Sequence, residues 1–194
     1  MSSPNHKWML GIVLASVAGC AGPGKPAGSQ HGADGPATGF GRPAILARNE
    51  GERRMLQGRK PLFIKVDPQT LGSRTLTVGL EDVPPGDSLG QHKHLAQDEV
   101  LFVHRGRVEV TLGDSTRRAE TGATVFVPRG TKIGLRVVGA DTATIFFVFN
   151  APGFEKCLRV LSAPVGTPFV RPPDSVISAT RRECNTVRRV GEPQ

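Results

Sequence analysis

Short apolar runs divided by turn residues fill the chain from Pro43 onward, and their spacing limits its fold more than any other feature. The runs lie at residues 62–66, 76–83, 100–103, 108–112, 125–127, 135–138 and 145–149. Several alternate apolar and polar side chains, as in Val108, Val110 and Leu112, which is typical of half-buried strands. Gly, Pro and Asp turns separate the runs, and no long helical stripe lies between them. The pattern therefore predicts an all-β domain, built as a sandwich or a barrel.

The length of the chain and the pattern of its C-terminal part define the rest of the domain. With 194 residues the chain can form one domain with a proper core and is too short for two comfortable ones. We expect a barrel over residues 43–160 and a C-terminal extension over residues 161–194. The expected pieces of the extension are a proline-broken crossing segment at 164–173, a short helix at 175–184 and an extended stretch at 186–190.

The first 42 residues read as export and tethering segments. Residues 1–20 combine a short polar start with an apolar run too short to span a bilayer, as in a signal peptide. The ending VAGC is similar to the bacterial lipobox, in which the cysteine, here Cys20, receives a lipid. Residues 21–42 are rich in Gly, Pro and Ala and would form a tether. We expect a lipid-anchored protein of the bacterial cell envelope, facing the periplasm or the exterior; the alternative for residues 1–20 is a buried hydrophobic helix.

The charge of the chain bears on its partners. The net charge is +8, from 25 Lys and Arg against 17 Asp and Glu. The excess is spread over scattered pairs, Arg53-Arg54, Arg117-Arg118, Arg181-Arg182 and Arg188-Arg189. A solvated surface near anionic lipid accounts for this distribution. Nucleic-acid binding would need a concentrated basic face with interleaved aromatic residues, and the chain has 9 Phe, one Trp and no Tyr. We therefore expect no nucleic-acid partner.

Two histidines and a glutamate make up the candidate site. His92 and His94 are two residues apart, so in a strand both imidazoles leave the same face while Lys93 points the other way. Residues 95–98 read as a turn, and Glu99 opens the next apolar run, which predicts a hairpin that brings its carboxylate to the two imidazoles. Such a set suits a divalent transition metal: iron, manganese, nickel, copper or zinc. The alternative is that the three are solvent-facing polar residues near a turn.

The spacing around these residues resembles the cupin family. Its first motif, G-x5-H-x-H-x(3,4)-E-x6-G, is matched in full by Gly86, His92, His94, Glu99 and Gly106. Its second motif, G-x5-P-x-G-x2-H-x3-N, is matched by Gly122, Pro128 and Gly130 and then departs, with Ile133 at the histidine and Val137 at the asparagine. The chain looks like the small single-domain cupins often called quercetin-dioxygenase-like, over residues 44–160. The resemblance implies a jelly-roll barrel, which agrees with the strand pattern.

The broken second motif limits the site that the resemblance implies. Ile133 has no lone pair to offer an ion, so His92, His94 and Glu99 would hold the metal alone, with water at the remaining positions. Gln91 and His104 are the nearest groups that could replace the missing ligand, and His104, five positions from Glu99, is expected to face outward. The set Ile133, Leu135 and Val137 is expected to make one wall of the interior apolar.

Three functions remain open at this point. The resemblance implies an enzyme that presents the metal to oxygen or to a small aromatic or enediol substrate, with Glu99 both coordinating and moving protons. A binding module would hold a small ligand or an ion without turnover. A structural remnant would keep the fold and mediate protein contacts. The resemblance also implies pairing of two copies as a homodimer.

The chain has three cysteines, of which one is the candidate lipid site and two could pair with each other. With Cys20 carrying lipid, Cys157 and Cys184 remain as an even pair in an oxidising compartment, where a disulfide is permitted. The alternative is two separately buried thiols. We expect a bridge to pin the C-terminal extension to the barrel.

Overall fold

A computed structural model describes residues 41–188 of the chain. The predicted signal peptide, the candidate lipid site Cys20 and all but the end of the predicted tether lie outside the described residues, as do residues 189–194. The strands are β1 (Glu52–Leu56), β2 (Lys60–Val66), β3 (Thr77–Val83), β4 (Ser88–His94), β5 (Glu99–Arg105), β6 (Arg107–Leu112), β7 (Ser115–Glu120), β8 (Thr124–Val127), β9 (Lys132–Val137), β10 (Ala143–Phe149), β11 (Ser162–Pro164) and β12 (Thr186–Arg188). The helices are α1 (Phe154–Val160) and α2 (Asp174–Glu183).

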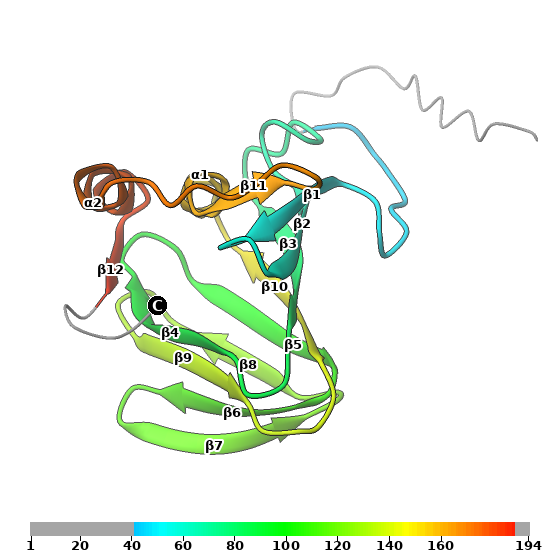
Figure 1. The fold of residues 1–194 in the computed structure, drawn as a ribbon, viewed down its shortest axis with the longest axis vertical. Coiled ribbons are helices and arrows are strands. Elements are labelled where there is room, and N and C mark those ends of the chain that lie inside the picture. Colours follow the sequence, from blue (N-terminus) through cyan, green and yellow to red (C-terminus); the bar gives the residue numbers. More distant parts are fainter. Residues whose placement is uncertain (1–40, 189–194) are drawn as a thin grey trace, which may run out of the picture. The chain divides into compact units, whose positions relative to one another are not determined.

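The strands form two antiparallel sheets, which confirms the all-β prediction (Figure 1). One sheet has the order β11-β1-β2-β3-β10-β5-β8 and the other has the order β12-β4-β9-β6-β7. The predicted helix at 175–184 is α2, shifted by one residue. None of the helices in the described residues is long and apolar enough to cross a membrane.

The core lies between the inner faces of the two sheets. Because side chains alternate along a strand, β10 buries Ile145, Phe147 and Phe149 while the side chains between them are more exposed. Strand β9 contributes Ile133 and Val137 from the opposite sheet. Removing a side chain of this size from water contributes about 1.5–3 kcal/mol, so the apolar runs explain why the chain folds around this interior.

The predicted hairpin between the histidines and Glu99 is wrong. Strand β4 pairs with β9 and β12, whereas β5 pairs with β10 and β8. Residues 95–98 therefore cross from one sheet to the other, and His94 and Glu99 face each other across the interior instead of along one ladder. The reason is that both strands bury one face, and each finds its hydrogen-bonding partners in its own sheet.

The C-terminal part is built into both sheets and is not a separate appendage. Strand β11 pairs with β1, and β12 pairs with β4 at the two histidines, with Thr186 opposite His94. Helix α1, just before β11, and helix α2, just before β12, lie side by side (Figure 1). The Cys157 thiol of α1 donates to the Thr180 carbonyl of α2 at 3.5 Å. The expected extended stretch at 186–190 thus begins as strand β12, which pairs with the part of β4 that carries His92 and His94.

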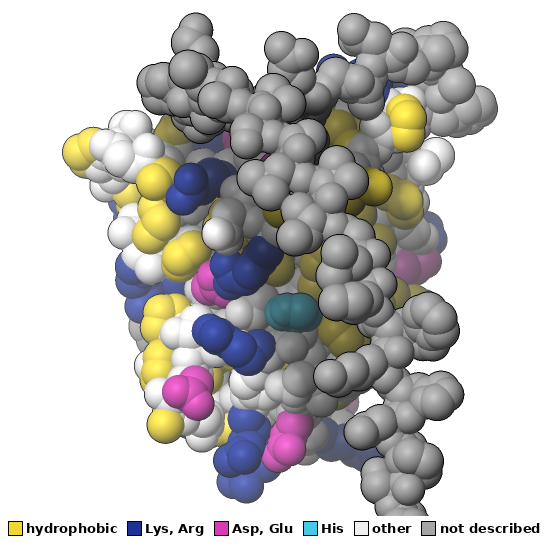
Figure 2. Space-filling view, turned by 90° about the vertical axis from the view of Figure 1, so that its right-hand side faces the viewer, with side chains coloured by type: hydrophobic (Ala, Val, Ile, Leu, Met, Phe, Trp, Pro, Cys, Tyr) yellow, Lys and Arg dark blue, Asp and Glu magenta, His cyan; other side chains and the backbone are white. Residues whose placement is uncertain are grey.

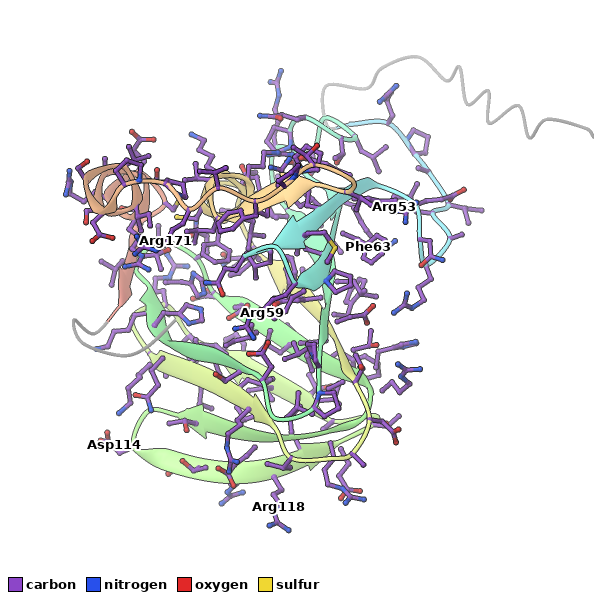
Figure 3. All side chains as sticks on the ribbon, viewed as in Figure 1. Arg53, Arg59, Phe63, Asp114, Arg118 and Arg171 are labelled. Carbon is purple, nitrogen blue, oxygen red and sulfur yellow. The ribbon has the colours of Figure 1, made fainter. Side chains whose placement is uncertain are left out.

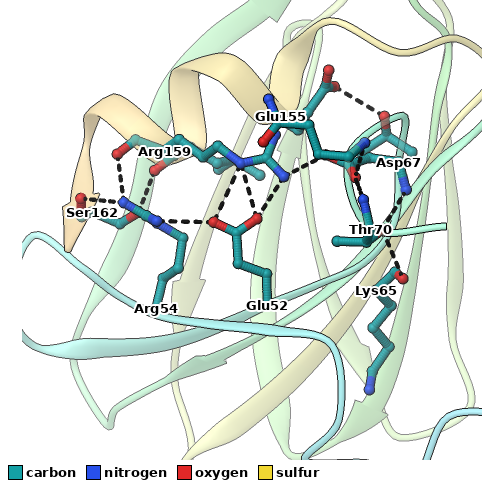
Figure 4. A network of polar contacts seen from close by, with 11 residues as sticks. Glu52, Arg54, Lys65, Asp67, Thr70, Glu155, Arg159 and Ser162 are labelled. Carbon is teal, nitrogen blue, oxygen red and sulfur yellow. Dashed lines mark hydrogen bonds and ion pairs between the residues drawn. The ribbon is translucent and has the colours of Figure 1, made fainter. Parts of the chain in front are cut away.

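A polar network fixes α1 to the larger sheet (Figure 4). The Arg159 guanidinium of α1 contacts Glu52 on β1 at 2.5 Å and Asp67, which follows β2, also at 2.5 Å. Arg54 bonds the same Glu52 at 2.9 Å and donates to the Ser162 hydroxyl. Asp67 is completely buried, whereas Glu52 is partly exposed, so the network ties the helix to one buried and one half-buried carboxylate.

The charged side chains of the described residues are dispersed. Figure 2 shows Lys and Arg interspersed with acidic and apolar side chains on the face in view. At the β6–β7 end, Asp114 and Arg118 project away from the sheet (Figure 3). Strand β7 is almost wholly exposed, because it is an edge strand.

Candidate metal centre

Strand β4 places the two histidines as their spacing predicts. His94 is 1% exposed and His92 is half-buried, while Lys93 between them is exposed. The register of β4 against β9 shifts between Leu89 and His92, and His92 then stands opposite Ile133. The Nδ1 atom of His92 lies 2.8 Å from the Gly90 carbonyl oxygen. That contact directs the Nε2 side of the ring toward the interior.

Three candidate ligands meet inside the barrel. The Nε2 atoms of His92 and His94 are 3.0 Å apart, and His94 Nε2 is 3.6 Å from Glu99 Oε2. Two atoms that share one ion through bonds of about 2.1 Å lie within about 4.2 Å of each other, so both contacts are short enough. The two facing sheets therefore bring the histidines and Glu99 together, although β4 and β5 do not form the predicted hairpin.

The fit of these residues to a metal can be tested on their unmet polar atoms. Glu99 Oε2 is buried and has no hydrogen-bond partner in the described residues, as expected of an oxygen that waits for a cation. His94 Nδ1 is also without a hydrogen-bond partner, whereas a metal-bound imidazole usually donates from its second nitrogen. Across residues 41–188, no three His, Cys, Asp or Glu side chains are grouped closely enough to hold an ion on their own. The donor types suit a transition metal, but the three side chains are not arranged around one ion and would have to reorient to bind it.

Burial controls the ionisation of the site. Desolvation, with a smaller effect of His92, lowers the pKa of His94 to about 3, so its imidazole is neutral at pH 7. Desolvation, reinforced by Glu81, raises the pKa of Glu99 to about 8, so this carboxyl is mostly protonated at pH 7. Their 3.6 Å contact is therefore not an ion pair near neutral pH. A bound cation would favour the carboxylate, and a neutral imidazole is the form that ligates metals.

Two phenylalanines that the sequence did not single out enclose the histidines. The Phe154 ring, at the start of α1, lies 4.4 Å from the His94 ring, edge to face, and 6.3 Å from the His92 ring, stacked. Phe149 of β10 lies 4.8 Å from His94. Helix α1 was not expected, because its seven residues carry too short a periodic pattern to be read.

A cavity of about 140 Å³ opens beside the candidate ligands. Ile133 and Leu135 line it, as predicted for the apolar wall, whereas Val137 is buried in the core and does not. Gln91 and His104 do not line it either, and His104 is exposed as expected. Neither residue replaces the missing fourth ligand.

The polar lining of the cavity includes two residues that the sequence analysis missed, Lys60 and Glu81. Burial raises the pKa of Glu81 to about 7, although Lys60 acts to lower it. Both residues occupy positions of the same parity as buried apolar neighbours on β2 and β3, as Lys60 does with Leu62. A charged residue at an inward position of an alternating run was the signal that could have found them.

Cys157, which lines the cavity, and Cys184 are both buried, and neither forms a disulfide in the structure. Hydrogen bonding to Cys184, followed by burial, raises the pKa of the Cys157 thiol. The disulfide between Cys157 and Cys184 stays a prediction.

Comparisons with known proteins agree with this geometry. A family model described as "Cupin domain" matches residues 79–149, which include all three candidate ligands. An uncharacterized protein of Streptomyces coelicolor is 36% identical over 84 residues, covering 43% of this chain and 78% of the relative. Polyketide synthase CurC of Streptomyces cyaneus is 27% identical over 106 residues, covering 55% of this chain and 68% of that protein.

Among solved structures, a predicted oxalate decarboxylase from Thermotoga maritima matches with a TM-score of 0.51 at 16% identity. The match covers 56% of this chain and the whole of that one. At this identity the likeness shows a shared fold.

Proposed function

The chain belongs to the cupin superfamily, and from that premise we propose that its barrel binds a divalent transition metal through His92, His94 and Glu99. The observation that supports this most is the approach of three donor groups from two different sheets, with contacts of 3.0 and 3.6 Å. Iron, manganese, nickel, copper and zinc all suit two imidazoles and a carboxylate. The ion itself, when bound, supplies Lewis acidity toward a ligand in the cavity.

The remaining steps of the proposal belong to the chain's own residues. In the metal-free barrel Glu99, with a pKa of about 8, holds a proton at the edge of the cavity near neutral pH, and it would give up this proton to become the carboxylate ligand of an ion. Phe149 and Phe154 keep water from the imidazoles by packing against the His94 ring. The apolar wall around Ile133 suits a small ligand with an aromatic or enediol core.

Two functions of this site differ in turnover. As an enzyme, the protein would be a dioxygenase-like oxidoreductase acting on such a ligand. As a binding module, it would hold the ligand or the ion without reaction, and the isoleucine in the second motif favours this alternative because it leaves the ion with fewer protein ligands. Oxygen uptake by the metal-loaded protein with a panel of aromatic diols distinguishes the two, since only the enzyme consumes oxygen.

Metal content tests the site. The full chain is purified without chelator, and its metals are measured by mass spectrometry alongside His92→Ala and His94→Ala variants. The matched control is His104→Ala, because His104 is exposed on β5, the same strand that carries Glu99. We expect close to one ion per wild-type and His104→Ala chain, and a strong loss in the other two variants. Equal metal content in all four proteins would refute the assignment.

We further propose that Cys20 carries a lipid that anchors the protein to the bacterial cell envelope, and that two copies pair as a homodimer. The lipobox-like ending before Cys20 supports the anchor. Intact-mass analysis of the membrane fraction should find a diacylglycerol-sized increase that Cys20→Ser abolishes. Light scattering of the detergent-solubilised protein tests the dimer.

A further inference from the structure

Lys60 and Glu81 form a second polar group at the cavity, separate from the three candidate ligands. Lys60 opens β2 and is 3% exposed, and Glu81 lies on the adjacent strand β3 and is 5% exposed. Both line the same cavity as His92 and Glu99. Charged side chains are almost never buried to this degree unless they are paired.

The pairing is incomplete. The Lys60 ammonium donates to the Ser88 carbonyl oxygen at 3.0 Å, and its nitrogen is 3.8 Å from Glu81 Oε1, which is too long for a hydrogen bond. Glu81 Oε1 is buried and has no hydrogen-bond partner in the described residues. An ammonium group carries three hydrogens, and the Ser88 carbonyl uses one of them. The cavity thus has a donor and an unmet acceptor side by side.

The gap between these two atoms has the size of one oxygen atom. An oxygen about 2.8 Å from both the Lys60 nitrogen and Glu81 Oε1 is geometrically allowed, because the two atoms are only 3.8 Å apart. A hydroxyl group satisfies both, since it accepts a hydrogen from the ammonium and donates its own to the carboxylate. When Glu81 is ionised, a carbonyl has no hydrogen to donate to it, and an ammonium has no lone pair to accept one from Lys60.

The remainder of the cavity sets the size and polarity of what carries that hydroxyl. Its volume of about 140 Å³ is close to the roughly 150 Å³ of a protein cavity that binds benzene. Leu135, Ile145 and Phe147 line it with apolar surface. We infer that Lys60 and Glu81 form the hydroxyl-binding end of the cavity, and that its ligand is a hydroxylated compound about as large as one aromatic ring.

This inference rests on the proposed binding of a small ligand in the barrel and adds the chemical class of that ligand. Its test uses phenol and toluene, which have the same number of heavy atoms and differ by the hydroxyl. Binding of each to the chelator-treated full chain is measured by isothermal titration calorimetry. Because the metal is removed, a failure of metal binding at the histidines leaves the outcome unaffected. We expect phenol to bind at least about tenfold more tightly than toluene, because hydrogen bonds to charged groups contribute a net free energy of about that size.

The decisive variant replaces both charges at once, Lys60→Met with Glu81→Met. Replacing a buried ion pair by apolar side chains of similar volume is often neutral for stability, whereas removing one partner leaves a buried charge. The matched control is Arg136→Met with Glu109→Met, a pair whose side chains are 58% and 32% exposed on the outer surface. We expect the double variant at the cavity to lose the preference for phenol and the control to keep it.

Two results would overturn the inference. One is phenol binding no more tightly than toluene to the wild-type protein, which includes the absence of phenol binding. The other is an unchanged preference in the Lys60→Met, Glu81→Met variant, because the hydroxyl would then be bound elsewhere. A crystal structure with phenol gives an independent readout, with the phenol oxygen expected within hydrogen-bond distance of both side chains.

Discussion

Replacing Arg159 by methionine perturbs the attachment of α1, the helix whose first residue covers both histidines. The change removes the guanidinium that contacts Glu52 and the fully buried Asp67, each at 2.5 Å. It keeps most of the apolar stem of the side chain. The perturbation therefore isolates the charge network of Figure 4 from ordinary packing.

The expected loss of stability depends on how strongly Glu52 and Asp67 each rely on Arg159. Breaking a buried ion pair by removing one partner costs about 3–5 kcal/mol. Glu52 is 26% exposed and keeps Arg54, so most of the cost falls on Asp67, which has no exposure but retains hydrogen bonds from two backbone amides. We expect a loss near the lower end, about 3 kcal/mol, which corresponds to about 6–12 °C in Tm.

Urea unfolding followed by far-UV circular dichroism measures this loss. Arg136→Met is the control, because the Arg136–Glu109 pair is exposed and should contribute less than about 1 kcal/mol. Arg159→Lys should fall between wild type and methionine, since a single ammonium cannot match the planar guanidinium that serves two carboxylates. A wild-type-like stability of Arg159→Met would refute the reasoning.

Three further predictions concern stability. Because the folded pKa of Glu99, about 8, lies above its ordinary 4.5, its contribution is fully present below pH 4.5 and is lost as the pH rises through 8. The metal-free wild type should lose on the order of 3 kcal/mol more than Glu99→Gln between pH 5 and 9 in urea unfolding, and parallel pH profiles would contradict this. Peptide mapping of unreduced protein from the envelope should find Cys157 joined to Cys184, a bridge worth roughly 3–4 kcal/mol, whereas two alkylated peptides would exclude it. Gly79→Ala should cost about 1–3 kcal/mol, because its methyl group would overlap the Phe147 ring and meet a strand carbonyl at 2.7 Å; an unchanged Tm would show that the ring yields freely.

The fold was predictable where burial is one-sided. Runs such as that at 145–149 alternate because one face packs inward, and the two-residue spacing of His92 and His94 placed both imidazoles on the same face. The same local rule gives no information on which strands pair. The link at 95–98 reads as a hairpin turn, yet pairing depends on the partners each strand finds in its own sheet.

The sequence analysis missed an exposed strand and a short helix, which have no periodic apolar pattern. It also missed two charged residues that stand where apolar residues are expected. Strand β7 is an exposed edge strand with the sequence STRRAE, so no alternation marks it. Helix α1 spans seven residues, and its Phe154 reaches the histidines only through the tertiary fold. Lys60 and Glu81 were overlooked because charged residues are expected at the surface, although Glu81 lies at an inward position of the run at 76–83 and Lys60 lies just before the run at 62–66.

The central claim is that His92, His94 and Glu99 jointly hold one ion. Anomalous diffraction from crystals of the full chain grown with Mn²⁺ or Zn²⁺ tests it most directly. The account predicts one strong peak about 2.0–2.3 Å from Nε2 of both histidines and from a carboxylate oxygen of Glu99. A peak bound elsewhere, or electron density in which the two imidazoles remain hydrogen-bonded to each other with no ion between them at saturating metal, would contradict it.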